Sequence, residues 1–592
     1  MRRACTLTAV LMVLSAVVPA VCRAAPRAGD DPEIDEIAGA RATAPSPLVA
    51  TGASPDGVVT LALDRAMYTQ FGGLSSVRLT GLPVAPGTVL DLDLDRFEVF
   101  AEDAVIVAVT DQGEVAQPRP DVQLWRGEVA GEPGSYAYLA LTPHGSMGHI
   151  RSLGRTYIVS SGVGGAMPTV VYDTAAPGAP ADAMSSPVCA GARNVPGVEP
   201  VWVDPGPAAS RDARSWSCRS IRLAVDCDNE FTNSTFGGNV ENATAYATLL
   251  IGAVSGIYTA DANLSLNLAY LRCWAAADPY TKASSGEQLD EFRAYWNSSM
   301  TSVSRSIAHL LSARNLGGGV AWVQVACNNS YGYAVSGNMA GTFPYPVADH
   351  RNQNWDLMVT AHEIGHNLGS GHTHDPGSFN PIIDGCGSSP QDCSQAWSGT
   401  IMSYCHTCPQ GMRNINMTLG PRPSEAIRNY LDGSAPNCGG HPTVTITTNP
   451  VPATLWVGQT ANFSATASAV GGGANVTYRW YRDGVKLTNV TNAAGTVVTG
   501  ANTAALTLTG VHTADKGFYS VIATNGCATA TSAEAILRCP SDFNSDGFVT
   551  GDDFDAFVDA FEQGAPAADF DANAFVNGDD FDGFVLAFAG GC

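Results

Sequence analysis

The run HEIGHNLGSGH, from His362 to His372, constrains this chain more than any other segment. On a helix, His362 and His366 are four residues apart, so both imidazoles project from one face toward a single metal ion. Glu363 lies between them, where its carboxylate can reach a metal-activated water as a general base. Gly369 can take the left-handed conformation that ends the helix, and the returning chain brings His372 to a third coordination position. Three neutral histidines leave a fourth position open to water, which predicts a catalytic zinc ion.

A second segment fits such a site. Residues 399–404 read Gly-Thr-Ile-Met-Ser-Tyr, and this run looks like the turn that underlies the zinc ion in metzincins, with Met402 as its methionine. The histidine motif and this turn together resemble the metzincin superfamily, most closely the reprolysin-like metalloendopeptidases, over about Ser215 to Cys438. The resemblance implies an α/β (α+β) catalytic domain, which we place at residues 212–440. The zinc ligands and the general base that it implies are His362, His366, His372 and Glu363.

The chain departs from the reprolysin pattern at two positions. Thr373 follows the third histidine, where an Asp is usual. Tyr404 stands two residues past Met402, where astacins and serralysins carry a tyrosine that can approach the zinc. Tyr404 either stabilises the oxyanion of a tetrahedral intermediate or packs in the core. We interpret His374 and His406 as residues behind the ligands or on the surface, and not as alternative ligands.

The same block contains a predicted substrate-binding strand. Residues 319–327 read as a buried strand, and Tyr331 to Met339 follows as the expected edge strand. In metzincins a strand in this place pairs with the extended substrate, and the alternative is a plain edge hairpin. Nine cysteines lie in the block, so one thiol is free or pairs outside it. The resemblance pairs Cys327 with Cys438.

The N-terminus has the layout of a secretory signal peptide, placed at residues 1–25. Arg2 and Arg3 precede a short apolar run and a zone of small residues. A membrane anchor is the alternative, but Pro19 and Arg23 cut the run short of the roughly 20 apolar residues that a span needs. We expect no transmembrane segment in the rest of the chain and a secreted protein, either free or attached to a cell surface. A net charge of −24 argues against a nucleic-acid partner.

Residues 26–211 are expected to be a β-rich, propeptide-like region with a linker. The segment from Trp125 to Gly162 resembles the last β-rich part of reprolysin propeptides. Cys189 lies in Pro-Val-Cys-Ala-Gly, which is similar to the Pro-x-Cys-Gly segment whose thiolate fills the open zinc position in those propeptides until cleavage. Cys189 is therefore either the cysteine switch of a zymogen or an ordinary disulfide partner.

Residues 441–538 read as the short alternating strands of an immunoglobulin-like domain. Trp480 looks like the core tryptophan of strand C, and Tyr519 resembles the tyrosine corner of strand F. Ala465 and Val521 stand where the inter-sheet disulfide usually lies, so this all-β sandwich would rely on apolar packing alone. The domain is either a ligand-binding module or a spacer, and we expect a spacer.

Residues 539–592 form an acidic tail with two copies of one pattern, which begin at Asp542 and Asp569. Oxygen side chains at loop positions 1, 3, 5, 9 and 12 have the ligand spacing of a calcium loop, with a backbone carbonyl at position 7. Each loop leads into one helix with Phe at helical spacing, whereas a disordered acidic tail, the alternative, would not need that spacing. The predicted calcium ligands are Asp542, Asn544, Asp546, Phe548, Thr550 and Asp553 in the first loop and Asp569, Asp571, Asn573, Phe575, Asn577 and Asp580 in the second.

This duplication of loop and helix resembles dockerins, a small α-helical calcium-binding module. The resemblance implies one or two Ca²⁺ ions and a cohesin-like or cell-surface partner. Ala574 replaces the Gly expected at position 6 of the second loop, which predicts weaker calcium binding there. Cys539 and Cys592 bracket the module and can form a disulfide across its ends.

Two functions from different classes follow from these modules. The first is a secreted zinc endopeptidase that hydrolyses peptide bonds of proteins, with spacer and attachment modules. The second is a non-catalytic extracellular adhesion or scaffold protein whose metzincin block is a relic. Relic metzincins commonly lose the base or a ligand, whereas Glu363 and the three histidines are all present here. The sequence therefore favours the peptidase.

Overall fold

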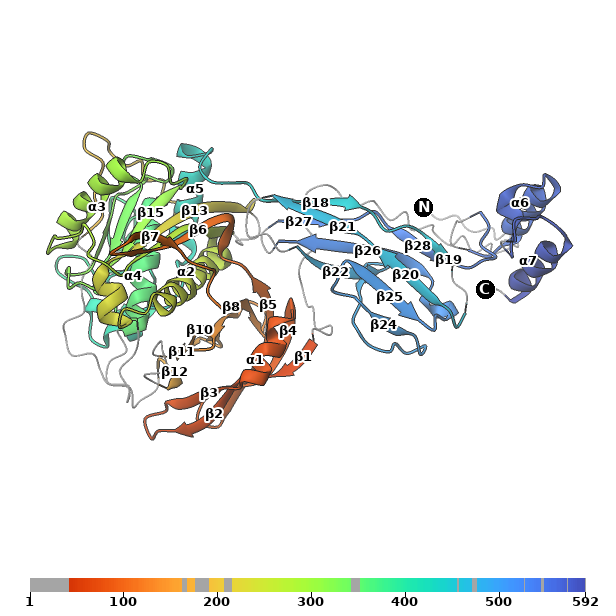
Figure 1. Cartoon of the computed structure of the whole chain (residues 1–592), viewed down its shortest axis with the longest axis horizontal. Helices are drawn as coiled ribbons and strands as arrows, with labels where there is room; N and C mark the ends of the chain where they lie inside the picture. Colours follow the sequence, from red (N-terminus) through yellow and green to blue (C-terminus); the bar gives the residue numbers. More distant parts are fainter. Residues whose placement is uncertain are drawn as a thin grey trace, which may run out of the picture. The chain divides into compact units, whose positions relative to one another are not determined.

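The computed structural model describes residues 42–592 apart from 162–167, 176–190, 207–215, 342–351, 455–456, 471–475, 526–527, 545–547, 572 and 591–592. The expected signal peptide, Cys189, Asp546 and Cys592 lie outside the described residues. The described chain forms a β-rich N-terminal region, a mixed α/β region, a β-sandwich and a helical tail (Figure 1).

A ten-stranded sheet makes up most of the N-terminal region, in the order β1-β4-β5-β8-β9-β10-β11-β12-β3-β2. Its neighbouring strands run antiparallel except for the parallel β1–β4 pair. Phe71, on the helix described in this region, packs edge-on against the fully buried Trp125, with 5.7 Å between ring centroids. The elements are β1 (Ala42–Pro45), β2 (Leu48–Ala53), β3 (Val59–Leu63), α1 (Arg65–Gly72), β4 (Ser76–Ala85), β5 (Thr88–Phe97), β8 (Gln123–Val129), β9 (Tyr136–Thr142), β10 (Gly145–Ser152), β11 (Arg155–Ser160) and β12 (Thr169–Asp173).

A seven-stranded sheet forms the centre of the α/β region, in the order β16-β17-β15-β13-β14-β6-β7. Strand β16 is antiparallel to β17, and the strands from β17 to β6 run parallel. The elements are β13 (Arg219–Cys227), α2 (Val240–Ala262), β14 (Leu264–Trp274), α3 (Ser285–Ser299), β15 (Ile307–Leu311), β16 (Gly319–Ala321), β17 (Tyr333–Ser336), α4 (Asn352–Asn367) and α5 (Pro421–Asn429).

The expected edge strand is wrong in its position. Tyr331 to Met339 contains β17, which lies between β16 and β15, whereas β16 is the strand at the edge of the sheet. Residues of both strands are buried. Because both strands are buried, their apolar sequences look alike, and the sequence does not show which of the two lies at the edge.

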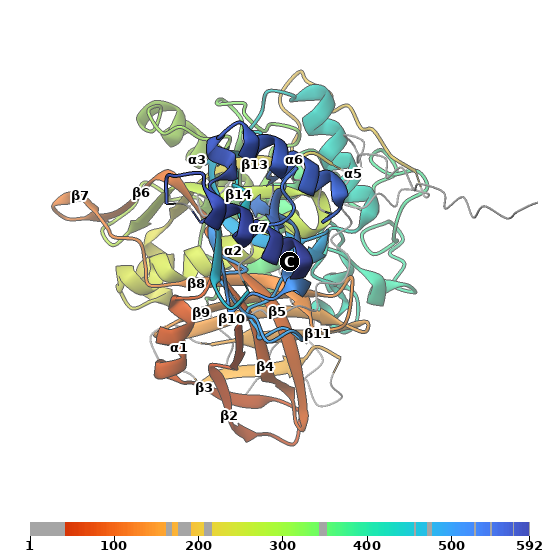
Figure 2. The ribbon, with the colours of Figure 1, turned by 90° about the vertical axis from the view of Figure 1, so that its right-hand side faces the viewer.

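Two strands of the seven-stranded sheet come from the N-terminal region. The hairpin of β6 (Phe100–Thr110) and β7 (Gly113–Ala116) leaves the first sheet, and β6 pairs in parallel with β14 (Figures 1 and 2). Arg222 of β13 also binds Asp103 of β6 through two hydrogen bonds of 2.9 Å. Residues 100–116 therefore belong structurally to the α/β region.

Helix α2 is long and apolar enough to cross a membrane by length and composition alone, yet 89% of its apolar window is buried inside the fold. Asn239 caps its first turn by accepting a hydrogen bond from the Asn242 N–H, and Asn263 ends it in a left-handed conformation with φ 46°. The Tyr258 hydroxyl donates to the Ala361 carbonyl of α4 over 2.8 Å. This helix is thus the support on which the motif helix α4 packs.

Disulfide bonds tie the second half of the α/β region together. The expected Cys327–Cys438 bond is confirmed, and Cys386–Cys405 and Cys393–Cys408 join the loops after α4. Cys218 is also disulfide-bonded, with none of the other eight cysteines of the block as its partner. Cys227 and Cys273 are free, buried and opposite each other on β13 and β14.

Residues 443–538 form the expected immunoglobulin-like sandwich. Trp480 is fully buried, and the Tyr519 hydroxyl donates to the Asp515 carbonyl over 2.7 Å, as a tyrosine corner does. Ala465 and Val521 are buried in the same core. The strands are β18 (Thr443–Thr448), β19 (Ala453–Thr454), β20 (Thr460–Ser464), β21 (Thr466–Val470), β22 (Thr477–Arg482), β23 (Val485–Lys486), β24 (Val497–Thr499), β25 (Ala505–Thr509), β26 (Gly517–Thr524), β27 (Thr529–Thr531) and β28 (Ala535–Arg538).

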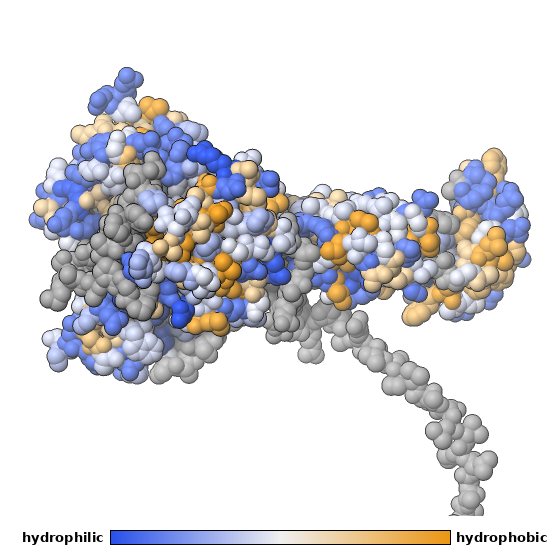
Figure 3. Space-filling model, turned by 90° about the horizontal axis from the view of Figure 1, so that it is seen from below, coloured by the Kyte–Doolittle hydropathy of each residue, from blue (hydrophilic) through white to orange (hydrophobic). Residues whose placement is uncertain are grey.

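The tail contains two helices, α6 (Gly551–Glu562) and α7 (Gly578–Gly590), whose phenylalanines face each other. Phe557 and Phe584 stack in parallel with 3.8 Å between centroids. Phe548 and Phe575, at equivalent positions of the two repeats, are 69% and 73% exposed, and apolar residues are visible on the surface of the tail in Figure 3.

Candidate active site

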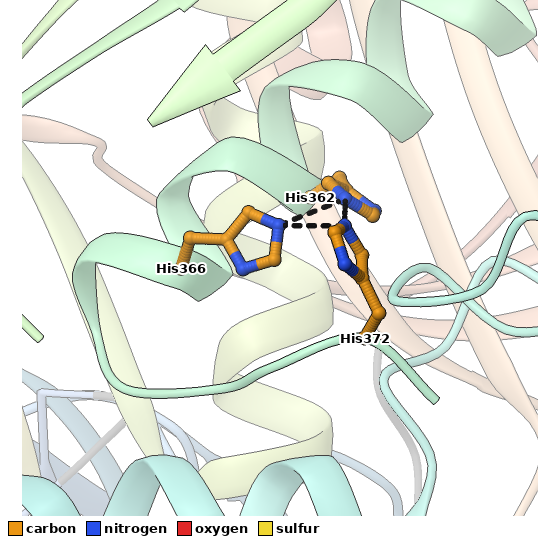
Figure 4. Close-up of side chains that lie close together, drawn as sticks. All are labelled: His362, His366 and His372. Atoms are coloured by element: carbon orange, nitrogen blue, oxygen red, sulfur yellow. Dashed lines mark hydrogen bonds between the residues drawn. The ribbon is translucent and has the colours of Figure 1, made fainter. Parts of the chain in front are cut away.

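The three motif histidines converge on one point at the end of α4. The Nε2 atom of His366 lies 3.1 Å from that of His362 and 3.1 Å from that of His372, and the remaining Nε2 pair is 3.2 Å apart (Figure 4). Ligand nitrogens about 2.0–2.1 Å from a tetrahedral zinc ion are roughly 3.3 Å from one another. The cluster therefore fits a zinc ion, and all three residues are buried or nearly so.

Backbone carbonyls fix the orientation of two of these rings. Nδ1 of His362 lies 2.7 Å from the Ile401 carbonyl, and Nδ1 of His366 lies 2.8 Å from the Ser370 carbonyl. Because a carbonyl only accepts, Nδ1 carries the proton in both rings and Nε2 keeps its lone pair for a metal. Burial also lowers the pKa of all three histidines, to about 4 for His366. The cluster is therefore neutral at pH 7, as metal binding requires.

Glu363 is fully buried beside the edge strand. A Cβ atom at Gly319 of β16 would collide with Oε1 of Glu363, so the strand approaches the carboxylate without a side chain between them. Gly317 and Gly318 precede Gly319 with φ angles of 85° and 130°, which favour glycine. This contact was not predicted from the sequence, although three consecutive glycines are a signal of close backbone approach.

The turn at Met402 lies beneath the motif helix. Met402 is fully buried, and a Cβ atom at Gly365 would stand 2.5 Å from its sulfur. Gly369 ends the helix with φ 112°, the left-handed conformation expected from the sequence, and packs against Tyr430. These two glycines set the height of α4 above the turn and the direction in which the chain leaves toward His372.

Aromatic rings lie next to the histidine cluster. The Tyr404 ring is half-buried and lies 4.6 Å from the His372 ring and 4.7 Å from the His374 ring. His374 stacks on His372 at 5.0 Å, and His406 is buried against Trp355. Neither His374 nor His406 belongs to a cluster of potential metal ligands in the described part of the chain.

Two other groups of potential ligands occur among the described residues. Asp384, Cys386 and Cys405 lie together, but the two cysteines form a disulfide and so cannot bind a metal as thiolates. In the second loop of the tail, Asp569, Asp571 and Asp580 have oxygens within 4.8 Å of one another. Ala574 adopts φ 70° there, a conformation that glycine would take with less strain.

Comparison with known families supports the reading of the histidine site. The family model described as metallo-peptidase family M12 matches residues 217–417, which include the three histidines, Glu363 and Met402. This part of the chain is a zinc metalloendopeptidase domain. The metalloendopeptidase domain is followed by a match to the immunoglobulin domain at residues 442–525. No curated protein matches the chain significantly.

Solved structures of other proteins resemble parts of the chain. Metalloproteinase-II from Bacteroides fragilis is similar over 62% of this chain and 94% of its own, at 10% identity and a TM-score of 0.32. A chimeric titin Z1Z2-Z1Z2 tandem is 30% identical over 16% of this chain and 49% of its own, with a TM-score of 0.14. Tandem immunoglobulin repeats of Dlar are 23% identical over 16% and 47%, with a TM-score of 0.13.

Proposed function

We propose that the protein is a secreted endopeptidase that hydrolyses peptide bonds of proteins with a zinc-activated water and Glu363 as general base. The observation that carries this proposal is the convergence of three Nε2 atoms within 3.2 Å of one another, next to a buried glutamate, in a metallopeptidase domain. The non-catalytic adhesion protein is the weaker reading, because every group that hydrolysis needs is present.

The residues of the site divide the chemistry among them. A zinc ion held by His362, His366 and His372 would polarise the scissile carbonyl and lower the pKa of a water molecule. The Glu363 carboxylate accepts the proton of the attacking water and returns it to the leaving amine. Tyr404, whose ring lies 4.6 Å from that of His372, donates a hydrogen bond to the oxyanion that develops in the transition state.

The outer modules add localisation and control to this activity. The signal-like residues 1–25 direct secretion. Cys189 is either the cysteine switch that holds the unprocessed chain latent or the partner of an ordinary disulfide bond. The two tail loops bind one or two Ca²⁺, which the proximity of three aspartates in the second loop supports. The tail then docks on a cohesin-like or cell-surface partner, with the immunoglobulin-like domain as a spacer.

Hydrolysis of unfolded casein by the secreted protein tests the central claim. We expect internal peptide bonds to be cut, activity to be lost with 1,10-phenanthroline, and activity to return with zinc added after removal of the chelator. Mass spectrometry of the products separates an endopeptidase from an exopeptidase. Chelator-resistant hydrolysis, or none by the processed protein, contradicts the proposal.

A further inference from the structure

A segment of the N-terminal region lies on the edge strand of the metalloendopeptidase domain. Arg193 forms a parallel bridge with Trp322, directly after β16. The Arg193 N–H donates to the Ala321 carbonyl over 2.9 Å, and the Val323 N–H donates to the Arg193 carbonyl over 3.0 Å. Arg193 thus forms a single-residue bridge to the free edge of the sheet.

This position is the one that an extended peptide substrate needs. A peptide that pairs with an edge strand uses the outward N–H and C=O groups of that strand. Two of those groups, on Ala321 and Val323, are already bonded to Arg193. Gly319, two residues before Ala321 on the same strand, lies against Glu363. Arg193 and a substrate residue close to the reacting bond therefore compete for the same backbone groups.

The Arg193 side chain enters a ready-made cation site. One guanidinium nitrogen lies 3.0 Å from the Asp290 carboxylate and donates to the Gly286 carbonyl over 3.0 Å, both on α3. The guanidinium also lies over the Trp322 ring, 4.7 Å from its centroid, as a cation–π contact requires. We call these three groups the cation subsite: Asp290, the Gly286 carbonyl and the Trp322 ring.

The direction of the bound strand does not change which side chain reaches the cation subsite. On paired strands, residues directly opposite each other project to the same face of the sheet in parallel and antiparallel pairing alike. A substrate residue opposite Trp322 therefore projects toward α3, as Arg193 does. A basic side chain there finds a carboxylate, a carbonyl and an aromatic face, whereas an acidic side chain meets the Asp290 charge.

The rest of the segment is held by two further contacts. The Gln324 carboxamide pairs with both backbone groups of Val201, over 2.9 Å each. The Asp204 carboxylate takes two short hydrogen bonds from Arg422, of 2.8 and 2.9 Å, and one of 2.8 Å from the Asn380 N–H. The segment is therefore also held at Val201 and Asp204. Gln324, which binds Val201, donates its own backbone N–H to the carbonyl of the zinc-ligand candidate His366.

We propose that the cation subsite binds an Arg or Lys side chain of the peptide substrate, and that Arg193 fills it in the uncleaved chain. This inference rests on the proposed function and names its substrate class, peptides with a basic residue opposite Trp322. Arg193 is then an internal stand-in for that residue, and its departure makes the subsite available.

Tryptic cleavage after Arg193 tests the docking without any activity of the enzyme. The full-length chain carrying Glu363→Gln is treated with trypsin, and the Arg193–Asn194 cut is followed by mass spectrometry. Asp290→Asn should speed this cut at least fivefold, because the guanidinium is released to the protease. Glu287→Gln removes a charge from the same helix without touching Arg193 and should leave the rate unchanged. Equal rates in all three chains overturn the docking.

Cleavage profiling of the secreted enzyme tests the substrate class. On a mixture of peptides, the wild-type enzyme should enrich Arg or Lys at one fixed position relative to the cut. For each enzyme, kcat/KM is measured on two peptides that differ only at that position, one with a basic residue and one with leucine. Asp290→Asn should lower the ratio of the two values (basic over leucine) at least fivefold, whereas Glu287→Gln should leave this ratio unchanged. Casein hydrolysis with no basic preference overturns the subsite and leaves the proposed function standing. Absence of all hydrolysis in the processed wild type contradicts the proposed function itself.

Discussion

Gly365 of the motif helix lies directly on the sulfur of Met402, where a Cβ atom would stand 2.5 Å from Sδ. The turn and the helix that carries the first two histidines are therefore in contact with no side chain between them. The distance between helix and turn therefore sets the height of the His362 and His366 Nε2 atoms relative to His372.

Gly365→Ala should destabilise the domain although alanine is the better helix former. Overpacking costs about 1–3 kcal/mol, and the gain in helix propensity of roughly 1 kcal/mol does not offset it. Thermal unfolding and zinc content check this, and both should fall. Gly286→Ala on α3 is the matched control, because no atom lies within 4 Å of its added Cβ, and it should be neutral or stabilising. Equal behaviour of the two variants would show that the contact with Met402 is unimportant.

Glu363→Gln should retain zinc but lose peptide hydrolysis, because an amide cannot accept the proton of the attacking water. We expect a loss of at least a hundredfold in kcat/KM with zinc content unchanged by elemental analysis. Activity within tenfold of the wild type in a zinc-loaded variant rules out Glu363 as the base.

The Asp356 carboxyl group of α4 predicts a pH dependence of stability. Burial raises its pKa to about 6, against hydrogen bonds from the Tyr246 hydroxyl and the N–H groups of Ala340 and Gly341 that favour the charged form. The folded state therefore holds a proton between pH 4 and 6 that the unfolded state has released, and stability falls as pH rises through that window.

The difference in unfolding free energy between wild type and Asp356→Asn isolates this group. It should fall by about 2 kcal/mol from pH 4 to 6 and change little above pH 7. Urea unfolding at a series of pH values measures it, with other titrations cancelling between the two chains. If the difference in unfolding free energy between the two chains does not change with pH, the pKa of Asp356 is not raised in the folded state.

A cysteine switch at Cys189 predicts a latent precursor. Thiol-modifying reagents should activate the unprocessed chain without cleavage, and Cys189→Ala should be active as soon as it folds. Hydrolysis of a quenched peptide by the uncleaved chain reports both effects. A Cys189→Ala precursor that remains latent assigns the block to another part of the N-terminal region.

Calcium should control folding of the tail. Twelve acidic residues from Pro540 to Cys592 repel one another without basic partners, and Ca²⁺ would neutralise them locally where Asp569, Asp571 and Asp580 meet. The isolated segment should gain helical circular dichroism with calcium and lose it with a chelator. Asp569→Ala should abolish the response of the second loop. Equal helicity with and without calcium would show that phenylalanine packing alone folds the tail.

The histidine site could be predicted because its information is local. A helix of known pitch places residues 362 and 366 on one face, and Gly369 has φ 112°, as the spacing to His372 requires. The tyrosine corner of Tyr519 and the facing phenylalanines of the tail followed from equally local patterns.

The features of the fold that were not predicted depend on pairing between strands far apart in the sequence, which local patterns do not encode. The alternation of apolar and polar residues from Phe100 to Thr110 does not indicate that β6 pairs with β14 and not with a strand of the ten-stranded sheet. The odd cysteine count left one thiol over, but only the register of β13 and β14 shows two free thiols, Cys227 and Cys273, side by side. The edge strand was misplaced for the same reason.

The β6–β7 hairpin changes what a maturation cut can achieve. A cut anywhere between Asp173 and Trp216 would leave two chains that still share one continuous sheet, because β6 stays hydrogen-bonded to β14 from Leu268 to Trp274. Phe100 and Ile106 are buried in the core that also holds α2 and α4. Cutting the backbone and discarding the N-terminal piece would thus be separate events, and a chain cut there would remain a two-chain molecule whose first piece supplies one inner strand of the α/β sheet.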